Sequence, residues 1–336
     1  MTKTVVDDVD NLTLDLDNAM FKTKKKRNKN SKFTFIDLFA GIGGTRLGFE
    51  SAGGECVFTS EWDIHSQKTY EANFGDKPHG DITKIKSSDI PDFDVLLAGF
   101  PCQPFSSIGK RQGFLHETQG TLFHDVARII KDKQPRAFML ENVPGLLTHD
   151  NGNTYKVIEN TLKELGYTVD HKVLNSAEFG VPQQRKRIYI VGFRKDVVED
   201  DFQFEYPEGK KKNVFISEFL EKNAEGYSIS KKLQDGYLHK LDDGRPMVVD
   251  HNSHIHVKTL VASYHKIQRL TGTFVKDGET GLRLFTHNEC KAIMGFPKDY
   301  IIPVSRTQMY RQFGNSIVVP VVSAVARKMA PVLSND

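Results

Sequence analysis

The sequence predicts an α/β protein, and two patterns carry that prediction. Short apolar segments that suit buried strands alternate with amphipathic segments that suit helices between residues 33 and 193. The first apolar segment, 33–39, runs into the glycine-rich turn 40–44, and the helix expected over 45–52 stops at two glycines. A strand, a glycine turn and a helix in this order are typical of α/β folds that bind nucleotides, although a glycine turn alone can also serve tight packing.

The composition is that of a soluble globular protein. The 336 residues include 46 Lys and Arg against 43 Asp and Glu, and the resulting net charge of +3 is too small to establish a nucleic-acid partner. Cys56, Cys102 and Cys290 are odd in number and widely spaced, which argues against a disulfide framework and against a zinc site. No apolar run approaches the roughly 20 residues that span a bilayer, and the N-terminus lacks a signal-peptide core. We therefore expect a cytoplasmic protein without a membrane partner.

The first 32 residues predict a disordered tail. An acidic portion precedes a basic one at 22–29, and neither has helical or strand periodicity. The basic run could add non-specific contacts to DNA phosphates, but a solvated tail explains it as well.

Polar residues recur where the next strands are expected to end. The strand at 56–60 leads into Glu61 and Trp62, roughly twenty residues after the glycine turn, where such folds place an acidic group that accepts hydrogen bonds from ribose hydroxyls. Trp62 suits either stacking on a purine or packing in the core. Asp81 offers a third polar group at another strand end. Together these strand ends predict a ligand of the adenosine type.

Cys102 lies where the apolar strand at 94–98 gives way to a loop. Pro101 and Pro104 flank the Cys-Gln pair and restrict the direction of the thiol. The stretch 105–120 is rich in glycine and has no periodicity, so it is a candidate for a mobile loop beside Cys102, whose thiol is a candidate nucleophile. A helix is expected from Leu122 to Ile130.

A carboxylate and two arginines follow at later strand ends. The strand expected at 137–144 contains Glu141, which is either an acid/base candidate or a surface ion-pair partner. Arg185 and Arg187 occupy alternate positions before the strand 188–193 and are expected to point the same way, although Arg-x-Arg is also common at solvated edges.

The alternation stops between 195 and 282, which we interpret as a second domain. His251, His254 and His256 suit solvated loops or phosphate contacts better than a metal, because no carboxylate or cysteine lies at ligand spacing. Basic residues interspersed with Tyr264 suit a nucleic-acid surface or a plain solvated face. Thr286 and Glu289 predict a capped helix over 286–294, with Cys290 in the core. The expected divisions are a tail at 1–32, a first domain at 33–194, a second domain at 195–282, a connecting segment at 283–305 and a C-terminal segment at 306–336 that packs back on the first domain.

Five motifs in this order resemble those of the bacterial DNA (cytosine-5)-methyltransferases. They are DLFAGIGG at 37–44, GFPCQPFS at 99–106, ENV at 141–143, QQRKR at 183–187 and RQFGNS at 311–316. The resemblance runs from about residue 33 to the C-terminus, apart from the variable region. It implies a Rossmann-like methyltransferase fold, with a mostly parallel sheet, helices on both faces, and a smaller, irregular, β-rich target-recognition domain. By this resemblance 33–194 is the catalytic and cofactor-binding domain, 195–282 is the target-recognition domain and 283–305 is a hinge.

The resemblance also implies S-adenosylmethionine as the cofactor and no metal. It implies these cofactor-binding residues: Phe39, Gly41 and Gly43 at the methionine part, Glu61 at the ribose, Trp62, Asp81 and Ile82 at adenine, and Pro101, Leu122 and Asn315 completing the pocket.

The implied reaction methylates C5 of a flipped-out cytosine in a short duplex DNA site. Cys102 would add to C6, Glu141 would act at N3, and Arg187 would hold the base with support from Arg185. The implied DNA contacts are Ser106, Lys110, Arg111 and the pair Thr259-Leu260. Gln119 departs from the arginine usual at its position, which puts one phosphate contact of the closed loop in doubt.

The implied partner is double-stranded DNA, bound by a monomer within a restriction-modification system whose endonuclease is a genetic partner. Two rival functions remain open. An RNA cytosine methyltransferase could share the fold, although the large variable region favours DNA. A DNA-binding repressor without catalysis is the other, and the presence of both Cys102 and Glu141 argues against it.

Overall fold

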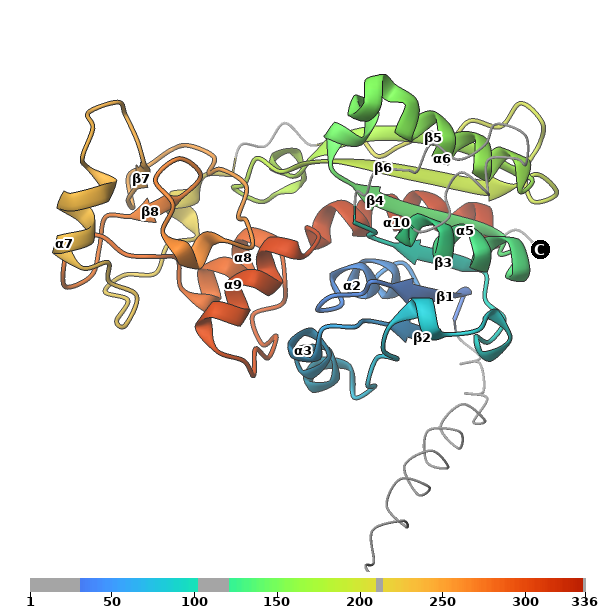
Figure 1. Ribbon diagram of the computed structural model, residues 1–336, viewed down its shortest axis with the longest axis horizontal. Coiled ribbons are helices and arrows are strands. Elements are labelled where there is room, and N and C mark those ends of the chain that lie inside the picture. Colours follow the sequence, from blue (N-terminus) through green and yellow to red (C-terminus); the bar gives the residue numbers. More distant parts are fainter. Residues whose placement is uncertain (1–30, 102–120, 210–213, 335–336) are drawn as a thin grey trace, which may run out of the picture.

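The computed structural model describes residues 31–101, 121–209 and 214–334. The expectations for the tail, for Cys102 and for the loop carrying Ser106, Lys110, Arg111 and Gln119 concern residues outside these ranges. The described chain forms a six-stranded sheet with helices on both faces, joined to a less regular part that carries a two-stranded sheet (Figure 1).

The large sheet has the strand order β2-β1-β3-β4-β6-β5. Its strands are β1 (Phe33–Leu38), β2 (Gly54–Ser60), β3 (Val95–Ala98), β4 (Ala137–Asn142), β5 (Tyr167–Asn175) and β6 (Lys186–Arg194). The first four pair in parallel, whereas β6 is antiparallel to both β4 and β5. The carboxyl ends of four strands therefore meet at one edge, where α/β enzymes place their ligands.

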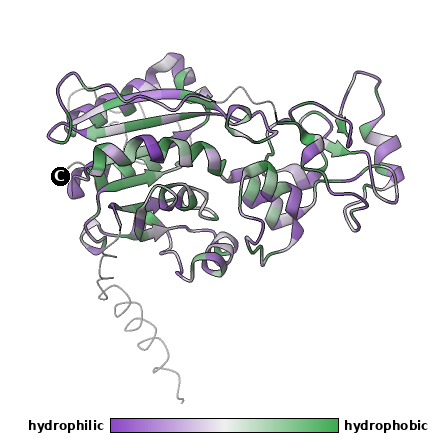
Figure 2. Cartoon of the chain, turned by 180° about the vertical axis from the view of Figure 1, so that it is seen from behind, coloured by the Kyte–Doolittle hydropathy of each residue, from purple (hydrophilic) through white to green (hydrophobic). Residues whose placement is uncertain are grey.

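Helices cover the sheet because alternate residues of each strand face opposite sides. Phe33 and Phe35 share a core with α2 (Gly44–Glu50) and α10 (Val319–Ser334). Ile36 and Leu38 share the other core with α5 (Leu122–Lys133) and α6 (Asn153–Glu164). Figure 2 shows hydrophobic residues concentrated on the strands and the inner helix faces.

The remaining elements lie beyond the edges of the large sheet. They are α3 (Ile64–Phe74), α7 (Lys231–Leu233), β7 (Met247–Val249), β8 (Thr273–Val275), α8 (His287–Met294) and α9 (Arg306–Asn315). Thr286 caps α8 with Glu289 in a reciprocal capping box, which confirms that predicted helix. In the described part of 195–282, regular structure is limited to short helical turns and the parallel pair β7–β8.

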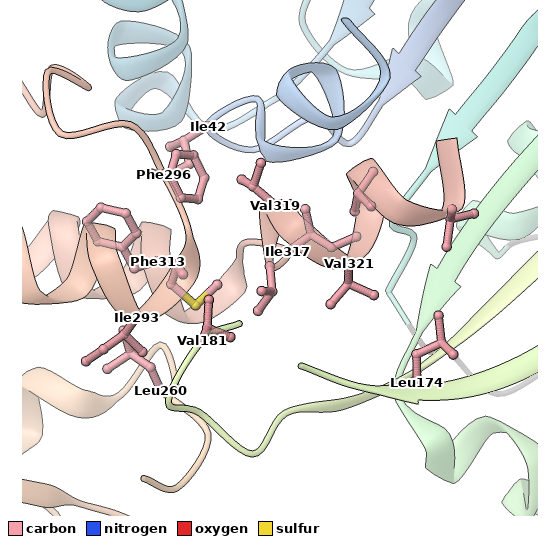
Figure 3. Packing of buried hydrophobic residues seen from close by; sticks show 14 of the residues in the cluster. Ile42, Leu174, Val181, Leu260, Ile293, Phe296, Phe313, Ile317, Val319 and Val321 are labelled. Atoms are coloured by element: carbon pink, nitrogen blue, oxygen red, sulfur yellow. The ribbon is translucent and has the colours of Figure 1, made fainter. Parts of the chain in front are cut away.

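The helical stretch Arg306–Ser334 is long and apolar enough to cross a membrane, but 67% of its apolar window is buried within the protein. Pro320 lies within this apolar run. It is in the first turn of α10, where a helix tolerates a missing N–H. Figure 3 shows Ile317, Val319 and Val321 at this junction, with Ile42 and Phe296 close together beside it. The C-terminal helices thus pack against the glycine turn after β1.

Candidate functional site

The glycine turn after β1 adopts left-handed backbone at three residues. Phe39 has φ 56°, Gly41 has φ 56° and Gly43 has φ 81°. A Cβ on Gly43 would lie 2.3 Å from the Phe74 ring, so only glycine fits there. A Cβ on Gly41 would meet no described atom within 4 Å, so the backbone at Gly41 borders open space. The turn therefore presents bare backbone to a ligand.

Glu61 ties the ends of β1 and β2 together. Its carboxylate accepts hydrogen bonds from the backbone N–H groups of Gly41 (2.7 Å) and Asp63 (2.8 Å). Burial raises the pKa of this carboxyl, and the two backbone donors oppose the shift. A carboxylate offers about four acceptor positions, so two remain for hydroxyl groups of a ligand.

The other adenosine-site candidates lie around Glu61. The Glu61 N–H donates to the carbonyl of His79 (2.8 Å), which brings the segment carrying Asp81 and Ile82 beside β2. Asp81 accepts hydrogen bonds from the Thr83 N–H and hydroxyl, and Ile82 is buried. Trp62 is 79% exposed, which excludes the core-packing alternative for its indole.

Three further predicted cofactor residues lie on the surrounding segments. Leu122 is half-buried at the start of α5, Pro101 is exposed after β3, and Asn315 is exposed at the end of α9. A Cβ on Gly44 would lie 3.2 Å from the Ser316 hydroxyl, so the end of α9 lies beside the glycine turn.

Asp37 is a buried group to which the sequence analysis gave no role. It is fully buried on β1 directly before the glycine turn, and neither carboxylate oxygen has a hydrogen-bond partner among the described residues. Burial raises the pKa of Asp37 to about 8. Arg46 opposes that shift, and Glu61 and Glu50 add to it. A protonated, neutral Asp37 is the expected form at pH 7.

Glu141 and Arg187 form an ion pair at the edge where the strands end. Arg187 Nε lies 3.0 Å from Glu141 Oε1, and both side chains are largely buried. Burial raises the pKa of the Glu141 carboxyl, while Arg187 and Arg185 oppose the shift. Glu141 Oε2 also lies 3.6 Å from the position of a Cβ on Gly99, so the carboxyl faces the segment that leads to Cys102. This arrangement suits a proton donor held in a fixed direction.

Arg185 has a different environment from Arg187. Its guanidinium is buried and donates to the carbonyls of Leu260 (3.0 Å), Gly314 (3.1 Å) and Ser316 (2.6 Å). Burial lowers the pKa of Arg185 to about 10, which leaves it charged at neutral pH. Arg185 therefore joins three chain segments close to Arg187.

The predicted DNA contacts at 259–260 belong to the same junction. The Thr259 hydroxyl donates to the Gln184 carbonyl (2.8 Å). Leu260 is buried, and its N–H donates to the Gln183 side chain (2.6 Å). Their contact with DNA remains a prediction.

Asn142 is a second residue to which the sequence analysis gave no role. Its side-chain N–H donates to the Phe100 carbonyl (2.8 Å), and its side-chain oxygen accepts from the Val143 N–H (2.8 Å). Asn142 thereby fixes the backbone two residues before Cys102. Only its place directly after Glu141 could have suggested this role.

The structure describes no group of three His, Cys, Asp or Glu residues that could hold a metal ion. In the histidine-rich segment, His254 and His256 pack against the ring of Phe215, with centroid distances of 5.4 and 6.1 Å.

Comparison with known proteins gives consistent matches. The family model of the C-5 cytosine-specific DNA methylases matches residues 33–330. The type II methyltransferase M.BsuFI of Bacillus subtilis is 63% identical over 306 residues, covering 91% of this chain and 74% of that protein. The type II methyltransferase M.MspI of a Moraxella species is 58% identical over 307 residues, covering 91% of this chain and 72% of that protein.

Two solved structures share the fold. The Entamoeba histolytica methyltransferase EhMeth has a TM-score of 0.69 at 22% identity, covering 91% of this chain and 98% of that chain. The S. pombe Dnmt2 methyltransferase also has a TM-score of 0.69, at 21% identity, covering 90% of this chain and 98% of that chain.

Proposed function

Because the chain belongs to the C-5 cytosine-specific DNA methylase family and is a DNA cytosine-5 methyltransferase, we propose that it methylates a flipped-out cytosine within a short, specific duplex site. The observation that carries this proposal is the Glu141–Arg187 ion pair, which faces the segment leading to Cys102. A hydride-transfer enzyme on the same fold would have no use for a cysteine directly after the segment that this carboxyl faces.

S-adenosylmethionine fits the residues at the strand ends. The open space at Gly41, the unused acceptor positions of Glu61 and the exposed indole of Trp62 suit its methionine, ribose and adenine parts. When bound, it supplies a methyl group on a positively charged sulfur. The proposed cofactor residues are Phe39, Gly41, Gly43, Glu61, Trp62, Asp81, Ile82, Pro101, Leu122 and Asn315.

The protein groups must make C5 of cytosine nucleophilic, because the aromatic ring is unreactive at that carbon. We assign Cys102 to the addition: its thiolate forms a bond to C6, and the displaced electron pair moves toward N3. Glu141 donates a proton or hydrogen bond to N3, and Arg187 holds Glu141 and the base oxygen O2. After C5 has taken the methyl group, a base removes the C5 proton and the electron pair of that bond re-forms the C5–C6 double bond. Cys102 leaves C6 as a thiolate, and N3 returns its proton to Glu141, which restores the ring.

The target base must leave the helix to reach these groups. We propose that Ser106, Lys110, Arg111, Thr259 and Leu260 contact the DNA, and that residues 195–282 recognise its sequence. A monomer acting in the bacterial cytoplasm would thereby protect host DNA from an endonuclease encoded with it.

The test is expression in a host that lacks DNA methylation, followed by mapping of 5-methylcytosine along the genome. We expect methylation at one short sequence, and its complete absence with Cys102→Ala. Cys290→Ala removes a buried cysteine of α8 and serves as the matched control, which should keep the pattern. A separate assay offers labelled cofactor with duplex DNA and with transfer RNA, and label in RNA alone would refute the DNA assignment.

A further inference from the structure

The loop formed by residues 265–271 is connected by hydrogen bonds to the segment that leads to the candidate catalytic site. Segment 257–259 runs beside the segment that leads to Arg187, since Gln184 N–H donates to the Val257 carbonyl (2.9 Å) and the Thr259 hydroxyl to Gln184. Lys258 Nζ then donates to the Leu270 carbonyl (3.0 Å). Segment 257–259 thus connects the 265–271 loop to Gln184, three residues before Arg187.

Buried contacts fix the backbone of this loop. Arg269 is buried, forms an ion pair with Asp243, and donates to the carbonyls of Leu238 (3.0 Å) and Leu241 (2.9 Å). Gly272 N–H donates to the Gln268 carbonyl (2.8 Å), which closes the turn. The loop is therefore a preformed element whose exposed side chains have set positions.

Gln268 is exposed on this loop, and two hydroxyl groups orient its side chain. Its Oε1 accepts hydrogen bonds from the hydroxyls of Ser263 (3.2 Å) and Thr271 (3.2 Å). These two bonds occupy both lone pairs of the amide oxygen. Gln268 Nε2 has no hydrogen-bond partner in the part of the chain that the structure describes, so the amide presents a donor to solvent.

We propose that Gln268 determines specificity for the DNA substrate by donating from Nε2 to an acceptor on a base edge in the major groove. This inference rests on the proposed function. Paired recognition of adenine needs a free amide oxygen as well as the nitrogen, and here the oxygen is occupied. The free donor instead suits a single acceptor, which guanine (O6 or N7), thymine (O4) and adenine (N7) each offer, and it disfavours cytosine, whose major-groove edge offers only an amino group.

The positive groups around the loop suit the same partner. Lys266 is exposed within the loop and Lys258 borders it, so both can approach the phosphates that flank the base being read. Phosphate contacts would hold the loop in register, while Gln268 supplies the discrimination.

The test compares four full-length proteins, wild type, Gln268→Ala, Gln268→Glu and Gln134→Glu, on duplexes that carry each single-base change in the mapped site. Gln268→Glu keeps an acceptor for Ser263 and Thr271 and removes the donor. Gln134 is an exposed glutamine at the C-terminal end of α5, outside the proposed recognition region, and provides the matched control for the added charge. The readout is kcat/KM for each duplex, relative to the unchanged site.

We expect both Gln268 variants to lose discrimination at one base pair of the site by about tenfold to a hundredfold, with the other positions unchanged. Ser263→Ala should reduce discrimination at the same base pair to a smaller extent, because the Gln268 amide oxygen then keeps only the hydrogen bond from Thr271. Unchanged discrimination at every position, or an equal loss of rate on all duplexes, would overturn the assignment of Gln268. Absence of methylation by the wild-type protein would instead refute the proposed function.

Discussion

Asp37→Asn should change how stability depends on pH. The pKa of Asp37 rises from 3.8 to about 8 in the folded protein because the carboxyl is fully buried, and Arg46 opposes this shift without cancelling it. Between these two pKa values, folding must take up a proton that the unfolded chain has released. The contribution of this group is fully present below pH 3.8 and is lost as pH rises toward 8.

The size of the effect follows from the shift. In this window each unit rise in pH lowers the free energy of unfolding by about 1.4 kcal/mol. Through Asp37 alone, the wild-type protein should therefore lose about 2.7 kcal/mol of unfolding free energy between pH 5 and pH 7. Asparagine does not titrate, and the variant should lack this slope. The free energy of unfolding of Asp37→Asn minus that of wild type should therefore rise by about 2.7 kcal/mol over the same interval.

The assay is urea unfolding followed by circular dichroism at pH 5 and pH 7. Asp299→Asn changes an exposed carboxylate and serves as the control, whose difference from wild type should stay constant. Because the comparison is between two pH values, any constant effect of the asparagine amide cancels. A difference that is equal at both pH values would show that Asp37 is ionised in the folded protein and would refute the reasoning.

Three other substitutions test the site and its supports. Glu141→Gln keeps the shape of the side chain but has no carboxyl proton to donate, so single-turnover methylation should slow by about 10²-fold or more. A rate near that of wild type would exclude Glu141 from proton transfer. Asn142→Ala removes the hydrogen bond to the Phe100 carbonyl, which fixes the backbone two residues before Cys102. We therefore expect kcat to fall about tenfold while the DNA dissociation constant is unchanged, and an unaltered kcat would contradict this positioning role of Asn142. Arg283→Met leaves the fully buried Glu289 without its ion-pair partner and should cost about 3 to 5 kcal/mol of unfolding free energy. Arg283→Met with Glu289→Gln removes the unpaired charge and keeps an acceptor for the Thr286 N–H, so it should cost less; equal losses in thermal unfolding would refute the pairing argument.

The elements near the site could be predicted from sequence because their signals are local. The apolar run at 33–39 and the glycines after it predict β1 and its turn, and the structure places β1 at Phe33–Leu38 with left-handed backbone at Gly41 and Gly43. The strand at 137–144 corresponds to β4, Ala137–Asn142. Strand formation and positive φ depend on residues a few positions apart, so a short window is sufficient.

The sequence could not decide the environment of individual side chains. Trp62 suited a core or a ligand surface equally, and only the packed structure shows its indole to be exposed. The antiparallel placement of β6 between β4 and β5 also escaped prediction, because strand order depends on contacts between distant segments.

Arg185 and Arg187 show the division most clearly. The motif at 183–187 and those at 37–44, 99–106 and 141–143 carry the resemblance to the DNA (cytosine-5)-methyltransferases, and that resemblance was sufficient to predict an α/β methyltransferase and to select both arginines. Tertiary structure alone directs Arg187 to Glu141 and Arg185 to the carbonyls of Leu260, Gly314 and Ser316. Those partners lie 46 to 131 positions away in the sequence, so only the folded chain can bring each charge to the group that stabilises it.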